Sequence, residues 1–268
     1  MVATTTTLRV GDIAVSALSD GTIRLPPGFY VNLDFEAHAD MLAPDGNVHV
    51  PIGCYLLRTG DRTVLVDAGM GPVTNRWGEG GGLPAALTAA GASPQDVDTV
   101  VCTHLHLDHA GWLVHEDAPW FPNATVRYGT GDWEQFVAGA PPEDRIRRAM
   151  EVLRDAGRLE PLDGDMVGIA PGVTARHTPG HTLGHYGIVL SSGEARAYLL
   201  GDAVECPLQL EEPDLSVMSD VDPGLAARTR ESIWREVEGS ADLVGAAHFP
   251  GLQLGRVLTG TGRRWVGV

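Results

Sequence analysis

The chain has 268 residues, enough to bury a full hydrophobic core without disulfides or metal ions as staples, and we expect one domain over residues 1–268. Its content of 43% hydrophobic and 20% charged residues excludes an intrinsically disordered protein. The formal net charge is −16 and all 19 basic residues are arginine, so the surface repels polyanions. This charge argues against nucleic acid or an anionic membrane as the main partner.

The N-terminal segment MVATTTTLRVGD has no basic stretch followed by an apolar run, so it predicts neither a secretion signal nor a membrane anchor. The three cysteines, Cys54, Cys102 and Cys206, are an odd number without CxxC spacing. This pattern does not indicate a disulfide framework and favours a reducing compartment. We therefore expect a cytoplasmic protein.

Short apolar runs separated by glycine and proline turns predict strands along much of the chain. The predicted strands cover residues 13–18, 52–57, 63–66, 98–102, 185–190, 196–201 and 242–247. Helices are predicted at 83–90, 143–156 and 223–238, and Pro84 suits a first helical turn. Strands at both ends with helices between them favour two β-layers with helices on the outside.

Residues 24–51 follow no sustained helical or strand period. Their apolar side chains, Phe29 and Leu33 among them, could cap a cleft or fold back onto the core. Both interpretations stay open at this point.

The segment VVCTHLHLDHAGW places His104, His106, Asp108 and His109 directly after an apolar run that is typical of a buried strand. Three imidazoles and a carboxylate within six residues are costly to bury unless a metal ion binds them. Residues two apart in an extended turn point the same way, so His104 and His106 can meet one ion, and the other pair can reach a second.

Three further candidates each lie beside a predicted strand: His181 in HTPGHTLGH, Asp202 in AYLLGDA and His248 in DLVGAAHFPG. An apolar run that ends in a polar side chain places it at the rim of a sheet, where functional groups gather. A single histidine of this kind is usually structural. These three residues together with the segment VVCTHLHLDHAGW favour a metal site.

With these residues in view, the chain resembles the metallo-β-lactamase superfamily over almost its whole length. The resemblance implies an α/β fold, a four-layer αββα sandwich with metals at the sheet edge. It implies that His104, His106 and His181 bind a first metal, that Asp108, His109 and His248 bind a second, and that Asp202 bridges them.

The stretches LVDAGMGP, GDAVECPLQLEEPDL and AHFPGLQLGRV narrow the resemblance to the branch of N-acyl homoserine lactone lactonases and methyl parathion hydrolase. Asp67 matches an aspartate of that branch that orients a ligating histidine or a turn. One departure is visible: lactonases often carry a tyrosine shortly after the bridging aspartate, and this chain has Glu205 and Cys206 in that stretch.

The implied activity is hydrolysis of a lactone or related carboxylic ester by a hydroxide that bridges two Zn²⁺ ions. Manganese, cobalt or iron could occupy the same ligands. Asp108 is the expected proton carrier. The expected partner is a small neutral or weakly charged substrate, and the branch leaves room for a homodimer.

Five residues are candidates for the substrate pocket, and each could equally serve packing. They are Trp112, Phe29, Leu33, Phe121 and Glu205. His177 and His185, four residues on either side of His181, are expected to be structural or to support the ligands.

Phosphotriester or arylester hydrolysis of the methyl parathion hydrolase type is the main alternative. A nuclease is disfavoured by the acidic surface and by only 46 residues between Asp202 and His248, and glyoxalase II by the 20 residues that follow His248. A β-lactamase and a sulfur dioxygenase with a single iron are weaker alternatives, because Asp202 stands where many β-lactamases use cysteine and the second ligand set is complete.

Overall fold

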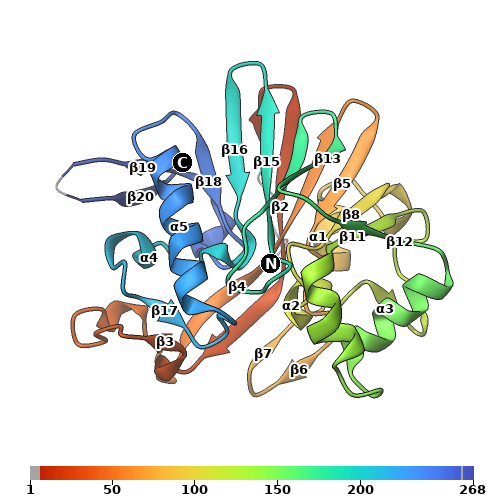
Figure 1. The fold of residues 1–268 in the computed structure, drawn as a ribbon, viewed down its shortest axis with the longest axis horizontal. Helices are drawn as coiled ribbons and strands as arrows, with labels where there is room; N and C mark the ends of the chain where they lie inside the picture. Colours follow the sequence, from red (N-terminus) through yellow and green to blue (C-terminus); the bar gives the residue numbers. More distant parts are fainter. Residues whose placement is uncertain (1–6, 261) are drawn as a thin grey trace.

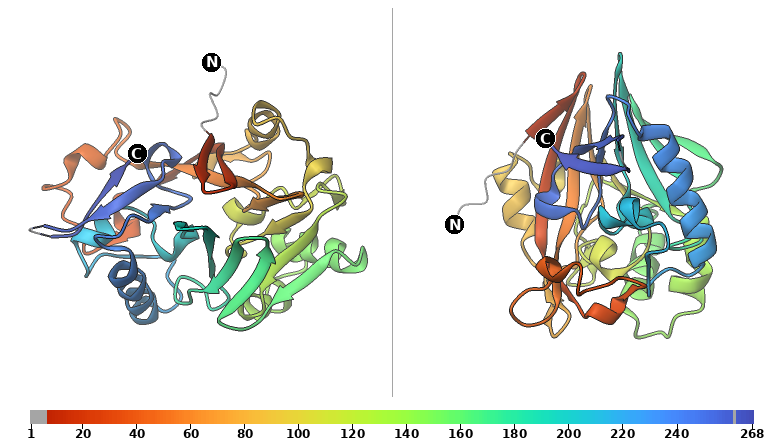
Figure 2. Two further views of the ribbon diagram at one scale, coloured as in Figure 1. Left: turned by 90° about the horizontal axis from the view of Figure 1, so that it is seen from above. Right: turned by 90° about the vertical axis from the view of Figure 1, so that its left-hand side faces the viewer.

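The computed structural model describes residues 7–260 and 262–268. The first six residues, which begin the N-terminal segment expected to contain no secretion signal, lie outside this range. Two large sheets face each other, with helices outside both (Figures 1 and 2). This arrangement confirms the predicted αββα sandwich.

The first sheet comes from the N-terminal half and has the order β12-β11-β8-β5-β4-β2-β7-β6, with β1 also paired to β2. Its strands are β1 (Thr7–Val10), β2 (Ile13–Leu25), β4 (Val48–Thr59), β5 (Arg62–Val66), β6 (Thr74–Asn75), β7 (Gly78–Glu79), β8 (Thr99–Val101), β11 (Thr125–Gly129) and β12 (Leu159–Leu162).

The second sheet comes from the C-terminal half and has the order β13-β14-β15-β16-β18-β19-β20. Its strands are β13 (Met166–Ala170), β14 (Val173–His177), β15 (Tyr186–Ser192), β16 (Ala195–Leu199), β18 (Leu243–Gly245), β19 (Gly255–Leu258) and β20 (Arg264–Gly267). Two small pairs complete the strands: β9 (Val114–His115) with β10 (Ala118–Pro119), and β3 (Tyr30–Val31) with β17 (Ser216–Val217).

The α-helices are α1 (Leu83–Ala89), α2 (Leu107–Ala110), α3 (Arg145–Asp155), α4 (Leu208–Glu211) and α5 (Pro223–Val237). Helices α1 and α3 pack on the outer face of the first sheet, and α5 packs on the outer face of the second. No helix in the described part of the chain is long and apolar enough to cross a membrane.

Alternation along the central strands explains why both faces of the first sheet are buried. Neighbouring residues such as Leu56 and Leu57 belong to different clusters, one beneath the outer helices and one between the sheets. Val100 and Val101 divide in the same way. Continuous apolar runs are typical of strands covered on both faces, which is why the sequence marked these segments clearly.

Residues 24–51 are less irregular than the sequence indicated. Strand β2 continues to Leu25, past a register shift between Ser19 and Gly21, and β4 begins at Val48. The intervening stretch contributes Leu33 and other apolar side chains to a small cluster with β3, β4 and β17.

Asp20, on strand β2, holds three other segments of the chain through hydrogen bonds. The residue is 1% exposed, and its carboxylate accepts five N–H hydrogen bonds of 2.7–3.1 Å. The donors are the backbones of Met70, Gly71, Gly81 and Leu83 and the indole of Trp112.

The change Asp20→Asn is expected to lower the free energy of unfolding by about 2–5 kcal/mol, because the amide NH₂ would replace one acceptor oxygen and leave the N–H donors that face it unsatisfied. Urea denaturation measures this loss. The matched control is Asp61→Asn, since the Asp61 side chain is 94% exposed and should shift stability by about 0.5 kcal/mol or less. An equal, small effect of both changes would contradict the role of Asp20.

Candidate metal centre

All seven predicted ligands lie just beyond strand ends, at one edge of the two facing sheets. His104, His106, Asp108 and His109 follow β8 of the first sheet. The other three ligands follow β14, β16 and β18 of the second sheet; they are His181, Asp202 and His248. Because β16 and β18 are parallel, and β14 runs the same way through its antiparallel neighbour β15, these ends meet.

The first donor group consists of His104, His106, His181 and Asp202, whose ligand atoms lie within 4.8 Å of one another. His104 Nε2 is 2.8 Å from His106 Nδ1, and His106 Nδ1 is 3.1 Å from His181 Nε2. Asp202 Oδ2 lies 3.5 Å from His181 Nε2. Three imidazole nitrogens and one oxygen thus converge on one point, as zinc requires.

The second donor group consists of Asp108, His109, His248 and the same Asp202. Asp108 Oδ2 lies 3.3 Å from both His109 Nε2 and His248 Nε2. Asp202 Oδ1 lies 3.3 Å from His109 Nε2 and 3.4 Å from His248 Nε2. Each oxygen of Asp202 therefore faces a different group, which is the geometry of a bridging carboxylate.

Buried atoms without partners test whether a cation fits here. His109 Nε2 and Asp202 Oδ1 are buried and have no hydrogen-bond partner in residues 7–260 and 262–268. Buried polar atoms are normally paired, and an unpaired one needs an explanation. A metal ion in the second donor group would bind both atoms, so the residues fit a divalent cation.

Acceptors behind the histidines fix which nitrogen faces the centre. His109 Nδ1 lies 2.9 Å from Asp67 Oδ2, and His181 Nδ1 lies 3.1 Å from Asp220 Oδ1. His248 Nδ1 donates to the carbonyl of Pro51 at 2.7 Å. Each contact leaves the Nε2 lone pair free for a metal, as outer partners of metal-binding histidines do.

His185 supports the site without belonging to either donor group. Its Nε2 accepts the backbone N–H of Asp202 at 3.1 Å, while its Nδ1 contacts the Thr178 hydroxyl at 2.7 Å. The ring therefore holds the backbone of the shared carboxylate. His177 instead contacts the backbone carbonyl of Leu183.

Burial favours the neutral form of two histidines of the first donor group, His104 and His106. It lowers the pKa of His104 well below its usual value, and burial with the nearby His181 lowers the pKa of His106 to about 4. A neutral imidazole has the free lone pair that a metal needs. Burial opposes ionisation of Asp202, yet His109 and His248 hold the pKa of that carboxyl well below its usual range.

The change Asp67→Asn is expected to weaken metal binding by the second donor group about 10–100-fold. Asp67 accepts from His109 Nδ1 and from the backbone N–H of Thr103, so an amide NH₂ turned toward the ring would force the proton onto Nε2. Competition with a chromophoric chelator measures the affinity. Unchanged affinity would show that Asp67 only shapes its turn.

An apolar cavity of about 460 Å³ opens onto the donor groups. His106, Asp108, Asp202 and His248 form its floor together with Glu205. Its walls include the apolar side chains of Ile23, Leu25, Pro26, Phe29, Met70, Leu107, Trp77 and Met218. Such a mostly apolar cleft with convergent polar groups is typical of a small-molecule site.

Two of the five pocket candidates, Phe29 and Glu205, line this cavity, and the other three do not. Trp112 and Phe121 are buried in the core beneath the outer helices, and the Trp112 indole donates to Asp20 at 2.8 Å. Leu33 packs in the cluster around β3 and β17. The pocket prediction for these three residues is therefore corrected to core packing.

Glu205 stands out among the cavity residues. Burial and the charge of Asp202 raise the pKa of Glu205 to about 8. Its Oε2 lies 3.9 Å from His248 Nε2 and has no hydrogen-bond partner within the described ranges. A polar group thus sits at the floor of the cavity, within reach of a bound substrate.

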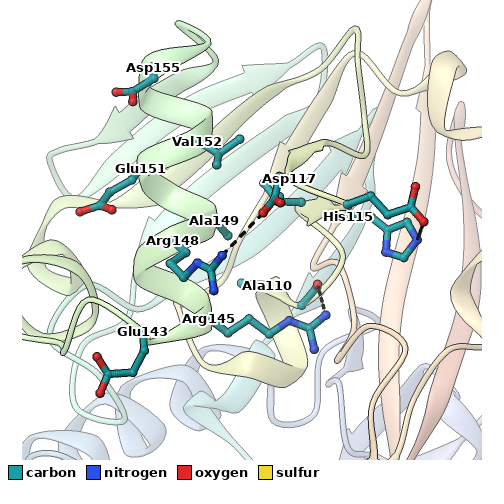
Figure 3. A pocket seen from close by; sticks show the side chains of 13 residues that line it. Ala110, His115, Asp117, Glu143, Arg145, Arg148, Ala149, Glu151, Val152 and Asp155 are labelled. Carbon is teal, nitrogen blue, oxygen red and sulfur yellow. Dashed lines mark hydrogen bonds and ion pairs between the residues drawn. The ribbon is translucent and has the colours of Figure 1, made fainter.

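A second, open cavity of about 580 Å³ lies between α3 and the β9–β10 turn (Figure 3). Its charged lining is mixed, with Arg148 paired to Asp117 across it and Arg145 donating to the Gly111 carbonyl. None of the seven predicted ligands lines it. The apolar cavity is therefore the one joined to the donor groups.

Known proteins resemble this chain in sequence and in fold. An N-acyl homoserine lactonase of a Bacillus species is 28% identical over 185 residues, which cover 63% of this chain and 69% of the relative. The N-acyl homoserine lactonase AiiB of Agrobacterium fabrum is 27% identical over 216 residues, covering 67% and 72%.

Two solved structures share the fold over all of this chain and 98% of their own. They are the hydrolase AbOPH, with a TM-score of 0.87 at 24% identity, and AidC, a dizinc quorum-quenching lactonase, with 0.85 at 21%. The model of the metallo-beta-lactamase superfamily matches residues 50–248, which include all seven residues of the two donor groups. The chain therefore belongs to the metallo-beta-lactamase superfamily.

Proposed function

We propose that this protein is a metal-dependent hydrolase that opens a lactone or a related carboxylic ester with two divalent metal ions, zinc foremost. One observation carries the proposal: two donor groups share Asp202 at the floor of an apolar cavity. Imidazole and carboxylate ligands suit zinc, and two adjacent metal sites are typical of hydrolytic enzymes. The relatives named as N-acyl homoserine lactonases support the choice of substrate.

The metal ions, when bound, would supply an activated water and polarise the carbonyl of the substrate. The cavity walls would hold the acyl part, with Phe29, Trp77 and Met218 as apolar contacts. Asp108 belongs to the second donor group and also faces the cavity, since its side chain is 18% exposed and that of Asp202 only 3%. It is placed to accept a proton from the attacking water and to pass it to the leaving alkoxide.

Glu205 favours a second candidate, hydrolysis of aryl esters or phosphotriesters. It occupies the cavity floor in the stretch where lactonases of this branch often place a tyrosine. Because this stretch has no tyrosine, the substrates to compare with lactones are aryl esters and phosphotriesters, whose leaving groups depart without a proton.

The test combines metal content per chain, by mass spectrometry, with hydrolysis of a panel before and after chelation. The panel holds acyl homoserine lactones, a phenyl ester, a phosphotriester and a β-lactam. About two metal ions per chain and chelator-sensitive lactone opening are expected. A single iron per chain, or two metals with no hydrolysis of any lactone or ester, would overturn the proposal.

A further inference from the structure

Asp132 lies outside both donor groups, in the short turn Thr130–Asp132 that follows β11. It is fully buried. Its Oδ2 accepts the backbone N–H of Leu105 at 3.1 Å, and its Oδ1 accepts the backbone N–H of Gly184 at 2.8 Å. One carboxylate therefore joins two segments that are 79 residues apart along the chain.

Both segments carry ligands of the first donor group. Leu105 stands between His104 and His106, and Gly184 lies three residues after His181. The first segment belongs to the β8 end of one sheet, and the second follows β14 of the other sheet. Asp132 thus bridges the two layers of the sandwich at the point where three imidazoles must converge.

Close backbone packing keeps this bridge short. A Cβ atom on Gly129 would lie 1.8 Å from the Gly184 carbonyl oxygen, and one on Gly184 would lie 2.5 Å from the Asp132 nitrogen. No side chain fits at either position without moving one segment. The glycines therefore permit the contact, and the Asp132 hydrogen bonds fix its register.

The second donor group is oriented by other residues. Asp67 holds His109, and the Pro51 carbonyl holds His248. The two hydrogen bonds to the Asp132 carboxylate oxygens come from the segments of the first group. A change at Asp132 should accordingly act on one group and spare the other.

We propose that Asp132 is a positioning residue for the first donor group, and that it sets the affinity of that group for its metal ion by holding the two ligand segments together. This inference rests on the ligand assignment of the proposed function and extends it to a residue that touches neither substrate nor metal. It requires no particular substrate.

Two single-group backgrounds test it. His248→Ala removes a ligand of the second group only, and His181→Ala removes a ligand of the first group only. The dissociation constant for Zn²⁺ is measured by chelator competition in each background, with and without Asp132→Asn. The amide that replaces the carboxylate in this variant would turn an NH₂ toward a backbone N–H and break one of the two hydrogen bonds.

We expect Asp132→Asn to weaken zinc binding about tenfold or more in the His248→Ala background. In the His181→Ala background the change should stay within about twofold, the usual limit for independent sites. Asp67→Asn is the matched control, because it replaces the buried carboxylate that contacts His109 of the second group, and it should show the reverse pattern. Gly184→Ala, which crowds Asp132, should act like Asp132→Asn.

Equal weakening in both backgrounds would overturn the inference, since it would mean a general loss of structure. Unchanged affinity in the His248→Ala background would overturn it as well. If the wild-type chain itself bound no zinc, the ligand assignment of the proposed function would be wrong, and the role of Asp132 would be wrong with it. The visible spectrum of the Co²⁺ form gives a second readout, because altered imidazole geometry changes its bands while a distant loss of stability does not.

Discussion

Replacing Asp108 by asparagine is expected to lower kcat for lactone opening about 10²–10⁴-fold, the range that a positioned proton carrier contributes. The metal content should fall much less. Asparagine keeps one oxygen for the second donor group, and His109, His248 and Asp202 remain as donors. What the amide cannot do is accept a proton from water and release it to the leaving alkoxide.

The leaving group separates proton transfer from other effects of Asp108→Asn. An alkoxide is a poor leaving group and needs a proton, whereas a nitrophenolate leaves without one. Where the wild-type enzyme hydrolyses both a lactone and a nitrophenyl ester, the variant should lose far more activity on the lactone. Equal losses on both substrates, in proportion to lost metal, would assign Asp108 the role of a ligand only.

The two donor groups could be predicted from the sequence because four of their residues share six consecutive positions after one apolar run, and the other three lie beside predicted strands. Strands covered on both faces, such as β5 and β8, leave continuous apolar runs that locate the edge of the sheet. Asp67 was indicated by the family resemblance, through the stretch LVDAGMGP, and the structure places it directly after β5.

Asp132 and Asp220 were missed because each is a lone acidic residue without a spacing pattern. The Asp220 side chain is fully buried between His181 and Arg230. Arg230 belongs to α5, so this contact forms only when that helix packs against the sheet. Asp132 did offer a signal, since it follows β11, which is parallel to β8. Polar residues in TVRYG concealed that strand, so its end could not be placed.

Trp112 shows why closeness in sequence misled the pocket prediction. It follows the ligand turn by three residues, but a buried indole needs an acceptor for its N–H. Asp20 on β2 supplies that acceptor and turns the ring into the core beneath the helices. The cavity wall comes instead from distant segments, including Trp77 after β6 and Met218 after β17.

Replacing Asp202 should have the most severe effect on metal content, because this carboxylate serves both donor groups. Its Oδ1 faces His109 and His248, and its Oδ2 faces His104 and His181. We expect Asp202→Ala to retain less than one metal ion per chain. Its metal affinity should fall by more than about a hundredfold, the upper range for loss of a residue that only supports a ligand. Asp202→Asn keeps one oxygen ligand and should retain about one ion.

This graded loss can be read from stability as well as from metal analysis. A ligand that binds only the folded state stabilises it by about 2.7 kcal/mol when present at a hundred times its dissociation constant. A chelator should therefore lower the unfolding temperature of the wild-type protein, lower that of Asp202→Asn less, and leave that of Asp202→Ala unchanged. If Asp202→Asn kept two ions and the full chelator response, each donor group would hold its metal without a shared carboxylate, and the bridging role of Asp202 would be wrong.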